Sequence, residues 1–296
     1  MRVQAEKGIG NQTMLAEEGP TTLQIRVGNR FTFESEQPTP SVFLVRPEVG
    51  GSHRVVEEHW ETEPLAGYHD YRDLYGNVCR RATLPTGPCA LRYDAVVETL
   101  PEPDPVALAA IEHFPADLPD EVLLYTLPSR YCLSDVLSGR AQELFGGLSP
   151  GWSRVQAICD WVHEQIHFSY GTSTVATTAA DVLEKREGVC RDFTHLAMTF
   201  CRALDIPARY VFGYIPDIDV PPPDSPMDFC AWFEAYLGGG WWTFDPRNNQ
   251  RRKGRVTIAR GRDAADVAMV TTYGPSTLQT MEVWADDMSA RGHAAA

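Results

Sequence analysis

The segment Gly188–His195 constrains the fold more than any other part of this sequence, because it sets a cysteine where a glycine-led turn meets an amphipathic helix. Apolar residues recur after it at helical spacing, namely Phe193, Leu196, Ala197, Phe200, Cys201 and Leu204. We therefore predict a helix that begins at or near Cys190. Unpaired N–H groups and the helix dipole favour a nucleophilic thiolate there. A buried structural cysteine is the alternative, because free cysteine is among the most buried residue types.

The length and composition are those of an ordinary globular protein. A chain of 296 residues exceeds the usual size of one domain, so two domains, or one large domain with extensions, are expected. Hydrophobic residues make up 43% and charged residues 22%, which argues against general disorder. The net charge of -14 repels phosphate backbones and anionic lipids, so we expect no nucleic acid and no membrane as partner.

The cysteine pattern and the first residues indicate the compartment. The seven cysteines form no C-x-x-C pair and no metal-finger spacing, which is typical of reduced thiols. No apolar run resembles a signal-peptide core or a membrane span. We expect a cytoplasmic protein without a metal or cofactor, and a homo-oligomer is compatible with the sequence.

Residue patterns divide the chain into four parts. Residues 1–20 are polar and without periodicity, which predicts a flexible lead-in. Residues 21–135 contain short β-prone runs between prolines and glycines, which predicts a β-rich domain similar to a β-sandwich. Helical and strand patterns then predict a core over residues 136–285 and a flexible tail over 286–296. The predicted fold class is α+β.

Helical signals come first in the predicted core. Ser149 and Pro150 resemble an N-cap and a first helical position, so a helix should run from there to about His167. A short helix near residues 179–184 precedes the helix that begins near Cys190.

Strand signals follow at residues 208–215, 230–237 and 241–244. If Gly238 and Gly239 form a two-residue hairpin loop, Trp232 faces Asp245 across the strands. Cys230 then lies on the same sheet face as Asp245, within reach of longer side chains.

Four motifs resemble successive motifs of the bacterial transglutaminase-like superfamily. They are Gly188–Phe193 (GVCRDF), Ile206–Val211 (IPARYV), Ala231–Tyr236 (AWFEAY) and Trp242–Pro246 (WTFDP). The resemblance covers roughly residues 149–245. It implies a papain-like core, in which a cysteine helix packs on an antiparallel sheet, and a peptide or protein substrate. Members of this family use a Cys-His-Asp triad for acyl transfer or amide hydrolysis.

Carried onto this chain, the resemblance implies Cys190 as nucleophile and Asp245 as orienting acid, and it places the triad histidine at Cys230. An imidazole accepts the thiol proton and returns it to the leaving amine, which requires a group that titrates near the working pH. A thiol titrates higher, so Cys230 is a poor general base. Alternatives are a reversible disulfide between Cys190 and Cys230, or a metal site of both sulfurs with Asp245.

Other histidines could replace the missing imidazole only if the fold brings them to Cys190. His195 lies about 140° around the helix from Cys190, so it is expected to be structural or at the edge of the cleft. His163 and His167 lie on another helix. The predicted substrate-binding residues are Trp232, Asp192 and His195, with a buried place in the sheet as the alternative for Trp232.

A basic segment follows Asp245 and consists of Arg247, Arg251, Arg252, Lys253 and Arg255. Such a segment could receive a substrate carboxylate, although a solvated charged loop is the more usual interpretation.

The predicted function is that of a transglutaminase-like cysteine enzyme, a protease, amidase or acyltransferase. It would act on peptide or amide bonds through an acyl-enzyme at Cys190, by hydrolysis or by transfer to an amine. The alternative is an inactive transglutaminase-fold protein that binds peptides, because Cys230 replaces the triad histidine.

Overall fold

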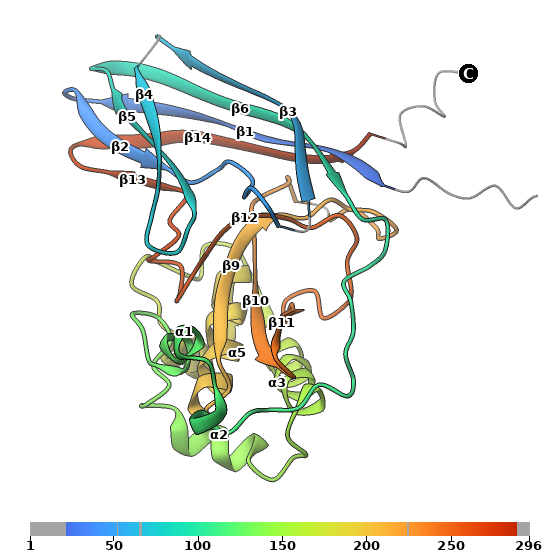
Figure 1. The fold of residues 1–296 in the computed structure, drawn as a ribbon. Helices are drawn as coiled ribbons and strands as arrows, with labels where there is room; N and C mark the ends of the chain where they lie inside the picture. The colour runs from blue at the N-terminus through green and yellow to red at the C-terminus, as the bar shows by residue number, and fades with distance from the viewer. Residues whose placement is uncertain (1–21, 52, 65–66, 224, 289–296) are drawn as a thin grey trace, which may run out of the picture.

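The computed structural model describes residues 22–51, 53–64, 67–223 and 225–288. It shows a β-sandwich that rests on a mixed helical and β-sheet core (Figure 1). The predicted α+β class, with a sandwich-like part followed by a papain-like core, is confirmed. The predicted lead-in and residues 289–296 of the predicted tail lie outside the described residues.

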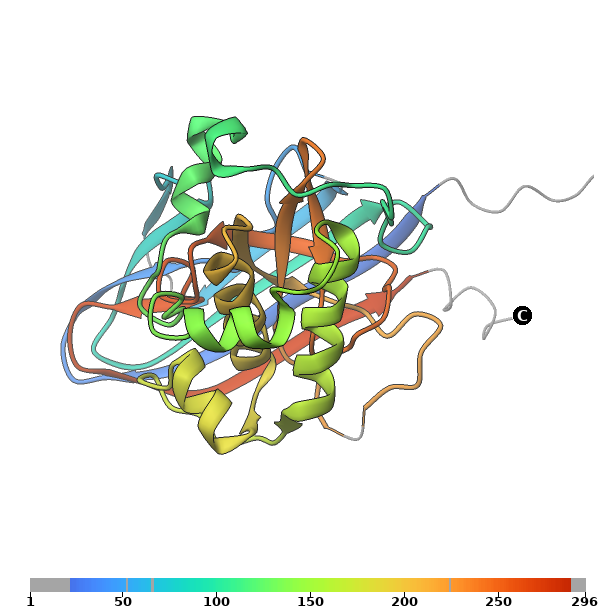
Figure 2. The ribbon, with the colours of Figure 1, turned by 90° about the horizontal axis from the view of Figure 1, so that it is seen from below.

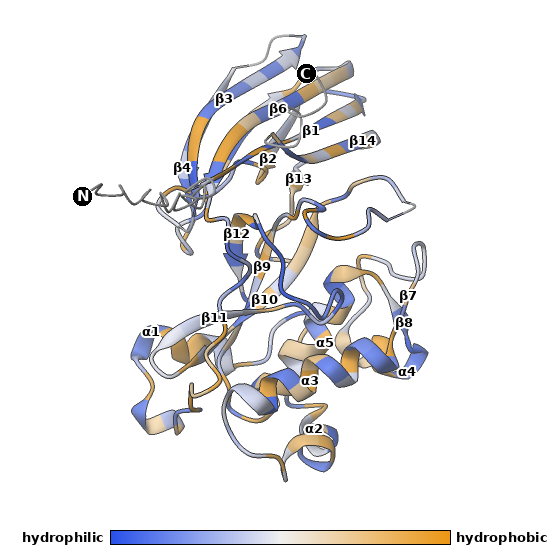
Figure 3. Cartoon of the chain, turned by 90° about the vertical axis from the view of Figure 1, so that its right-hand side faces the viewer, coloured by the Kyte–Doolittle hydropathy of each residue, from blue (hydrophilic) through white to orange (hydrophobic). Residues whose placement is uncertain are grey.

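Two antiparallel sheets form the sandwich. The first has the spatial order β14 (Ser276–Asp287), β1 (Leu23–Ser35), β6 (Gly87–Thr99) and β3 (His53–Glu63). The second has the order β13 (Val270–Thr272), β2 (Thr39–Phe43), β5 (Val78–Leu84) and β4 (Tyr68–Arg72). Fully and partly buried residues alternate along most of β6 because successive side chains point to opposite faces. Both hydrophobic and hydrophilic residues lie along this strand (Figure 3). Phe33 and Phe43 meet edge to face between the sheets, with ring centroids 6.0 Å apart.

The two C-terminal strands belong to the sandwich. β14 pairs antiparallel with β1, and β13 pairs antiparallel with β2. The sequence-based division places most of both strands in the core over residues 136–285 and starts a flexible tail at 286, so the structure differs from it here. The reason is physical, since pairing between strands far apart in the chain leaves no local periodicity.

The core sheet is antiparallel and helices pack against it. Seen from below, these helices lie in front of the sandwich strands (Figure 2). Its strand order is β11 (Gly240–Phe244), β10 (Cys230–Leu237), β9 (Ala208–Tyr214) and β12 (Val256–Gly261). The helices are α2 (Ser138–Phe145), α3 (Trp152–Gln165), α4 (Ala179–Lys185) and α5 (Cys190–Ala203). α5 contacts β9, β10 and the other three of these helices, and its residues 192–202 are all buried. The predicted helix start at Cys190 is confirmed.

Short elements complete the chain between these parts. They are η1 (Pro115–Asp117), α1 (Asp120–Leu123), η2 (Leu124–Thr126) and the parallel pair β7 (His167–Phe168) and β8 (Glu187–Gly188). The described part of the chain contains no helix with the length and hydropathy of a membrane span.

Helix α3 starts later than predicted. Its N-cap is Gly151 and not Ser149. Gly151 has a φ of 110°, in the region that glycine tolerates best. The N–H of Trp152 donates to the carbonyl of Ala110 at 3.0 Å, so the connecting segment caps the helix.

Aromatic packing joins the sandwich to the core beside the predicted site. The ring of Phe229 lies 6.3 Å from Phe31 of β1. It also lies 5.0 Å from Phe212 and 5.2 Å from Tyr214, both of β9. These contacts fix the start of β10, where Cys230 lies, against both halves of the molecule.

Candidate active site

The turn before α5 positions Cys190 through a buried carboxylate. Asp192 accepts a hydrogen bond from the N–H of Val189, the N-cap residue, at 2.8 Å. Gly188 is required here, because a Cβ at this position would lie 2.7 Å from the Cβ of Asp192. The sequence GVCRD therefore forms a tight helix start that presents Cys190 as the first residue of α5.

The Cys190 thiol lies against the edge of β10. Its Sγ is 3.9 Å from the carbonyl oxygen of Phe229, to which it donates. Burial, together with the charge of Asp228, raises the pKa of Cys190 to about 11. The Ala231 N–H and the Arg247 guanidinium oppose this rise but are outweighed. The thiolate expected at the helix start is therefore not favoured at neutral pH.

Cys230 is the second thiol of the site. It pairs with Gly213 across β10 and β9, and its Sγ lies 3.8 Å from the carbonyl oxygen of Asp228. Burial raises the pKa of the Cys230 thiol, as do the charges of Cys190 and Asp245. Neither sulfur is a ready proton acceptor for the other near pH 7.

Both cysteines open into one cavity of about 280 Å³. Apolar and aromatic side chains form much of its wall, and these include Phe168, Tyr170, Ile215 and Met227. Charged and polar groups form the rest, and these include Arg191, Arg247, Asp228 and Asn248. The structure thus places Cys190 and Cys230 on the wall of the same cavity.

Asp245 lies behind this cavity. The pairing of Leu237 with Gly240 and of Phe233 with Phe244 is the hairpin register predicted from the two glycines. Asp245 follows β11 and lines a different cavity, of about 290 Å³. Its carboxylate is linked by hydrogen bonds to Asn248 of the Cys190 cavity, whose backbone N–H and Nδ2 donate to it at 2.9 and 2.8 Å.

A guanidinium holds Asp245 in the absence of an imidazole. Arg255 donates to the Asp245 carboxylate at 2.9 Å and to that of Asp104 at 2.8 Å, and its side chain is only 7% exposed. Arg252 is buried as well and bonds to Asp217 and to the carbonyl of Pro216. The basic segment is therefore not a solvated loop throughout. The sequence alone gives little sign that these arginines are buried and paired, because the partners of Arg255 lie in different parts of the chain.

The three residues predicted to bind substrate are buried and do not line the Cys190 cavity. Asp192 caps α5, and Trp232 lies in the sheet with 1% exposure. His195 accepts a hydrogen bond from the Ala264 N–H at 3.2 Å and stacks on Tyr131 with centroids 5.0 Å apart. These positions correct the sequence-based assignment, since side chains that pack inward are unavailable to a ligand.

The described wall of the Cys190 cavity includes no histidine. Burial lowers the pKa of His195 to about 3, so its ring is neutral. His163 Nδ1 donates to the carbonyl oxygens of Pro246 and Arg247 at 3.2 and 3.0 Å. Within the described ranges, no group of three or more His, Cys, Asp or Glu side chains is arranged to hold a metal ion.

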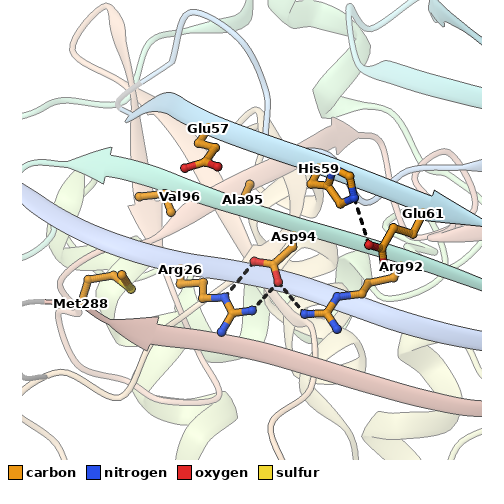
Figure 4. A pocket seen from close by; sticks show the side chains of 9 residues that line it. All are labelled: Arg26, Glu57, His59, Glu61, Arg92, Asp94, Ala95, Val96 and Met288. Atoms are coloured by element: carbon orange, nitrogen blue, oxygen red, sulfur yellow. Dashed lines mark hydrogen bonds and ion pairs between the residues drawn. The ribbon is translucent and has the colours of Figure 1, made fainter.

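Another recess, of about 520 Å³, lies on the first sandwich sheet (Figure 4). Most of its charged side chains are paired with one another. Asp94 accepts hydrogen bonds from Arg26 at 2.9 Å and Arg92 at 2.8 Å, and His59 lies 3.0 Å from Glu61. No thiol or hydroxyl side chain is among its described lining residues, so the Cys190 cavity remains the better candidate for chemistry.

Comparisons with known proteins agree with this geometry. The family profile of the transglutaminase-like superfamily matches residues 138–246. A crystal structure from Cytophaga hutchinsonii, described as a "putative cysteine protease", is 32% identical with a TM-score of 0.83, and the match covers 91% of this chain and 92% of that one. An uncharacterized protein of Mycobacterium leprae is 27% identical over 266 residues, or 83% of this chain and 91% of the relative. Another, from Mycobacterium tuberculosis, is 28% identical over 217 residues, or 66% and 68% of the two chains. With these matches and with Cys190 at the start of a helix packed on an antiparallel sheet, the chain belongs to the transglutaminase-like superfamily.

Proposed function

We propose that this protein binds a peptide or protein segment in the Cys190 cavity without the acyl transfer of a Cys-His-Asp triad. The observation that carries the proposal is the composition of the cavity wall, which contains two thiols and, among its described residues, no histidine. The family resemblance implies an imidazole at position 230, where this chain has a cysteine.

The electrostatics of the site support the same proposal. At a pKa of about 11, roughly one Cys190 thiol in ten thousand is ionised at pH 7. The described wall of the cavity offers no imidazole that could accept the thiol proton and return it to a leaving amine. Asp245 is occupied by Arg255 and Asn248, so its carboxylate is already hydrogen-bonded.

The enzymatic alternative is a cysteine protease, amidase or acyltransferase that forms an acyl-enzyme at Cys190. Two features favour it, namely the position of the thiol at a helix start on a cavity and the backbone N–H of Ala231, which lowers the pKa of Cys190. The description of the Cytophaga structure as a cysteine protease points the same way. The two functions differ in turnover, which can be measured directly.

Turnover of β-casein separates the two functions. Peptide release, ammonia release and incorporation of a fluorescent cadaverine are measured with the native protein and with Cys190→Ala as the matched control. We expect both proteins to give the same background in all three assays. A rate at least tenfold above that of the Cys190→Ala variant in any assay would overturn the binding proposal in favour of an acyl-enzyme.

Restoring the base tests why turnover is absent. Cys230→His places an imidazole beside the Cys190 thiol, so we expect alkylation of Cys190 by iodoacetamide at pH 7 to accelerate at least about tenfold. Cys230→Asn, a polar residue without a titrating group, is the control and should react at the native rate. Equal rates for all three proteins would show that position 230 is not where the base is missing.

A further inference from the structure

We infer that the Cys190 cavity takes a ligand that carries a carboxylate, and that Arg247 is the residue that recognises it. The inference rests on the proposed binding function and names the class of ligand for the same cavity. It is drawn from the positive charges on the described cavity wall, of which those of Arg252 and Arg191 face carboxylates of the protein and that of Arg247 does not.

Arg247 is held in place by neutral contacts. Its Nη1 donates to the side-chain oxygen of Asn248 at 2.7 Å, and its guanidinium carbon lies 4.5 Å from the centre of the Phe168 ring. Asn248 is fixed in turn by Asp245. In the described ranges Arg247 forms no ion pair with a carboxylate. A half-buried, oriented guanidinium with donors to spare is suited to a planar carboxylate.

The neighbouring arginines contrast with Arg247. Arg252, which also lines the cavity, is bonded to Asp217 at 2.8 Å. Arg191 donates to Ser173 Oγ at 2.9 Å, and its Nε lies 3.6 Å from the buried carboxylate of Asp192. The protein itself therefore provides a carboxylate partner for Arg252 at hydrogen-bond distance and a more distant carboxylate partner for Arg191.

Asp228 is the carboxylate on the wall that opposes this charge. It accepts a hydrogen bond from the Phe229 N–H at 2.7 Å, and burial raises its pKa. The raised pKa makes the charge of Asp228 easier to remove, whereas a guanidinium keeps its charge throughout the working pH range. Arg247 also reaches the sulfurs electrostatically, since it lowers the pKa of both Cys190 and Cys230. A carboxylate beside the sulfurs would therefore meet a permanent positive charge.

The apolar side of the cavity indicates what surrounds the carboxylate. Phe168, Tyr170, Ile215 and Met227 form this side, so the ligand has an apolar part beside its acid group. The net charge of -14 opposes the approach of anions to the molecule as a whole. The unpaired Arg247 is thus a local feature of the cavity and does not reflect the overall charge.

Two alkylating reagents of similar size test the inference, because iodoacetate is anionic and iodoacetamide is neutral. In both reactions the Cys190 thiolate attacks the methylene carbon, a C–S bond forms, and iodide leaves with the electron pair of the C–I bond. Rates are measured at pH 8.5 on the full chain and normalised to the rates for N-acetylcysteinamide. Trypsin separates the labels, because Cys190 falls within residues 187–191 and Cys230 within residues 210–247.

We expect the normalised ratio of iodoacetate to iodoacetamide labelling at Cys190 to be at least about threefold above unity, from one nearby charge. Arg247→Gln should return the ratio to about one, and Arg247→Lys should retain most of the preference. Arg251→Gln is the matched control, because Arg251 contacts the carbonyls of Asp104 and Pro103 and lies outside the Cys190 cavity. A native ratio near one, or a raised ratio that survives Arg247→Gln, overturns the inference.

Competing peptides distinguish the source of the carboxylate. The probes are Ac-Leu-Glu-Leu-NH2, with a side-chain acid, Ac-Leu-Gln-Leu-OH, with a terminal acid, and the neutral Ac-Leu-Gln-Leu-NH2. If either acidic peptide protects Cys190 from iodoacetamide more strongly than the neutral peptide does, the inference is supported. The more protective peptide then identifies the source of the carboxylate. Equal protection by all three contradicts it. The outcome of the β-casein assays does not change the labelling ratios of iodoacetate and iodoacetamide. The proposed function and this inference can therefore be contradicted independently of each other.

Discussion

Two opposing effects act on the Cys190 thiol, and their magnitudes decide its state. A helix N-terminus stabilises a neighbouring negative charge by about 0.3–1 kcal/mol, which is less than one pKa unit. Burial raises the pKa of Cys190 from 9.0 to about 11, a larger effect in the opposite direction. The sequence shows the helix start but not the hydrocarbon around the sulfur, so it predicts only the smaller effect.

The pH dependence of alkylation checks this balance. Because only the thiolate reacts, the rate of iodoacetamide labelling at Cys190 should rise about tenfold per pH unit from pH 7 and level off near pH 11. Peptide mass spectrometry follows Cys190 separately from Cys230. A plateau below pH 8 would show that the helix start outweighs burial.

His195 makes stability depend on pH. An unfolded histidine binds a proton near its ordinary pKa of 6.5, whereas burial lowers the folded pKa of His195 to about 3. Acid therefore favours the unfolded chain, and this loss begins below pH 6.5 and continues toward pH 3, by up to about 1.4 kcal/mol per pH unit. Urea unfolding from pH 7 to pH 4 should show a steeper loss for the native protein than for His195→Gln. Parallel curves for the two proteins would contradict the assignment.

At the scale of elements, the α5 start shows how much the local sequence determines. The order of the core elements, the start of α5 at Cys190 and the β10–β11 register all follow from capping residues, periodicity and a pair of glycines. The bond between Arg255 and Asp104 does not, because the two residues are 151 positions apart. Such contacts between residues far apart in the chain decide whether Asp245 is free to orient an imidazole. Local sequence patterns do not predict them.

The cap of α5 can be tested by two substitutions of one residue. Asp192→Ala removes the acceptor for the Val189 N–H and should lower the free energy of unfolding by about 1–2 kcal/mol. Asp192→Asn keeps a side-chain oxygen and should retain most of the stability. Urea unfolding at pH 7 measures both, and an equal loss in the two variants would show that the cap bond is not the cause.

At the scale of the whole molecule, Phe229 links the sandwich, the core sheet and the cavity. Its ring packs between β1 and β9, and its carbonyl accepts from the Cys190 thiol. Phe229→Ala should therefore lower the free energy of unfolding by about 3–5 kcal/mol, whereas Phe229→Leu should cost less than about 1.5 kcal/mol. Denaturant unfolding gives both values. A loss below 1 kcal/mol for Phe229→Ala would show that the ring is dispensable at this junction.

The pairing of β14 with β1 determines the order in which the protein can be completed during translation. A ribosome releases the N-terminal strands first, yet β1 must wait for β14 before both of its edges are covered. Every residue of the helical part emerges from the ribosome after β1 and before β14. The cysteine-bearing unit can therefore acquire its shape while the first sheet still has an open edge, and the last strand closes that edge.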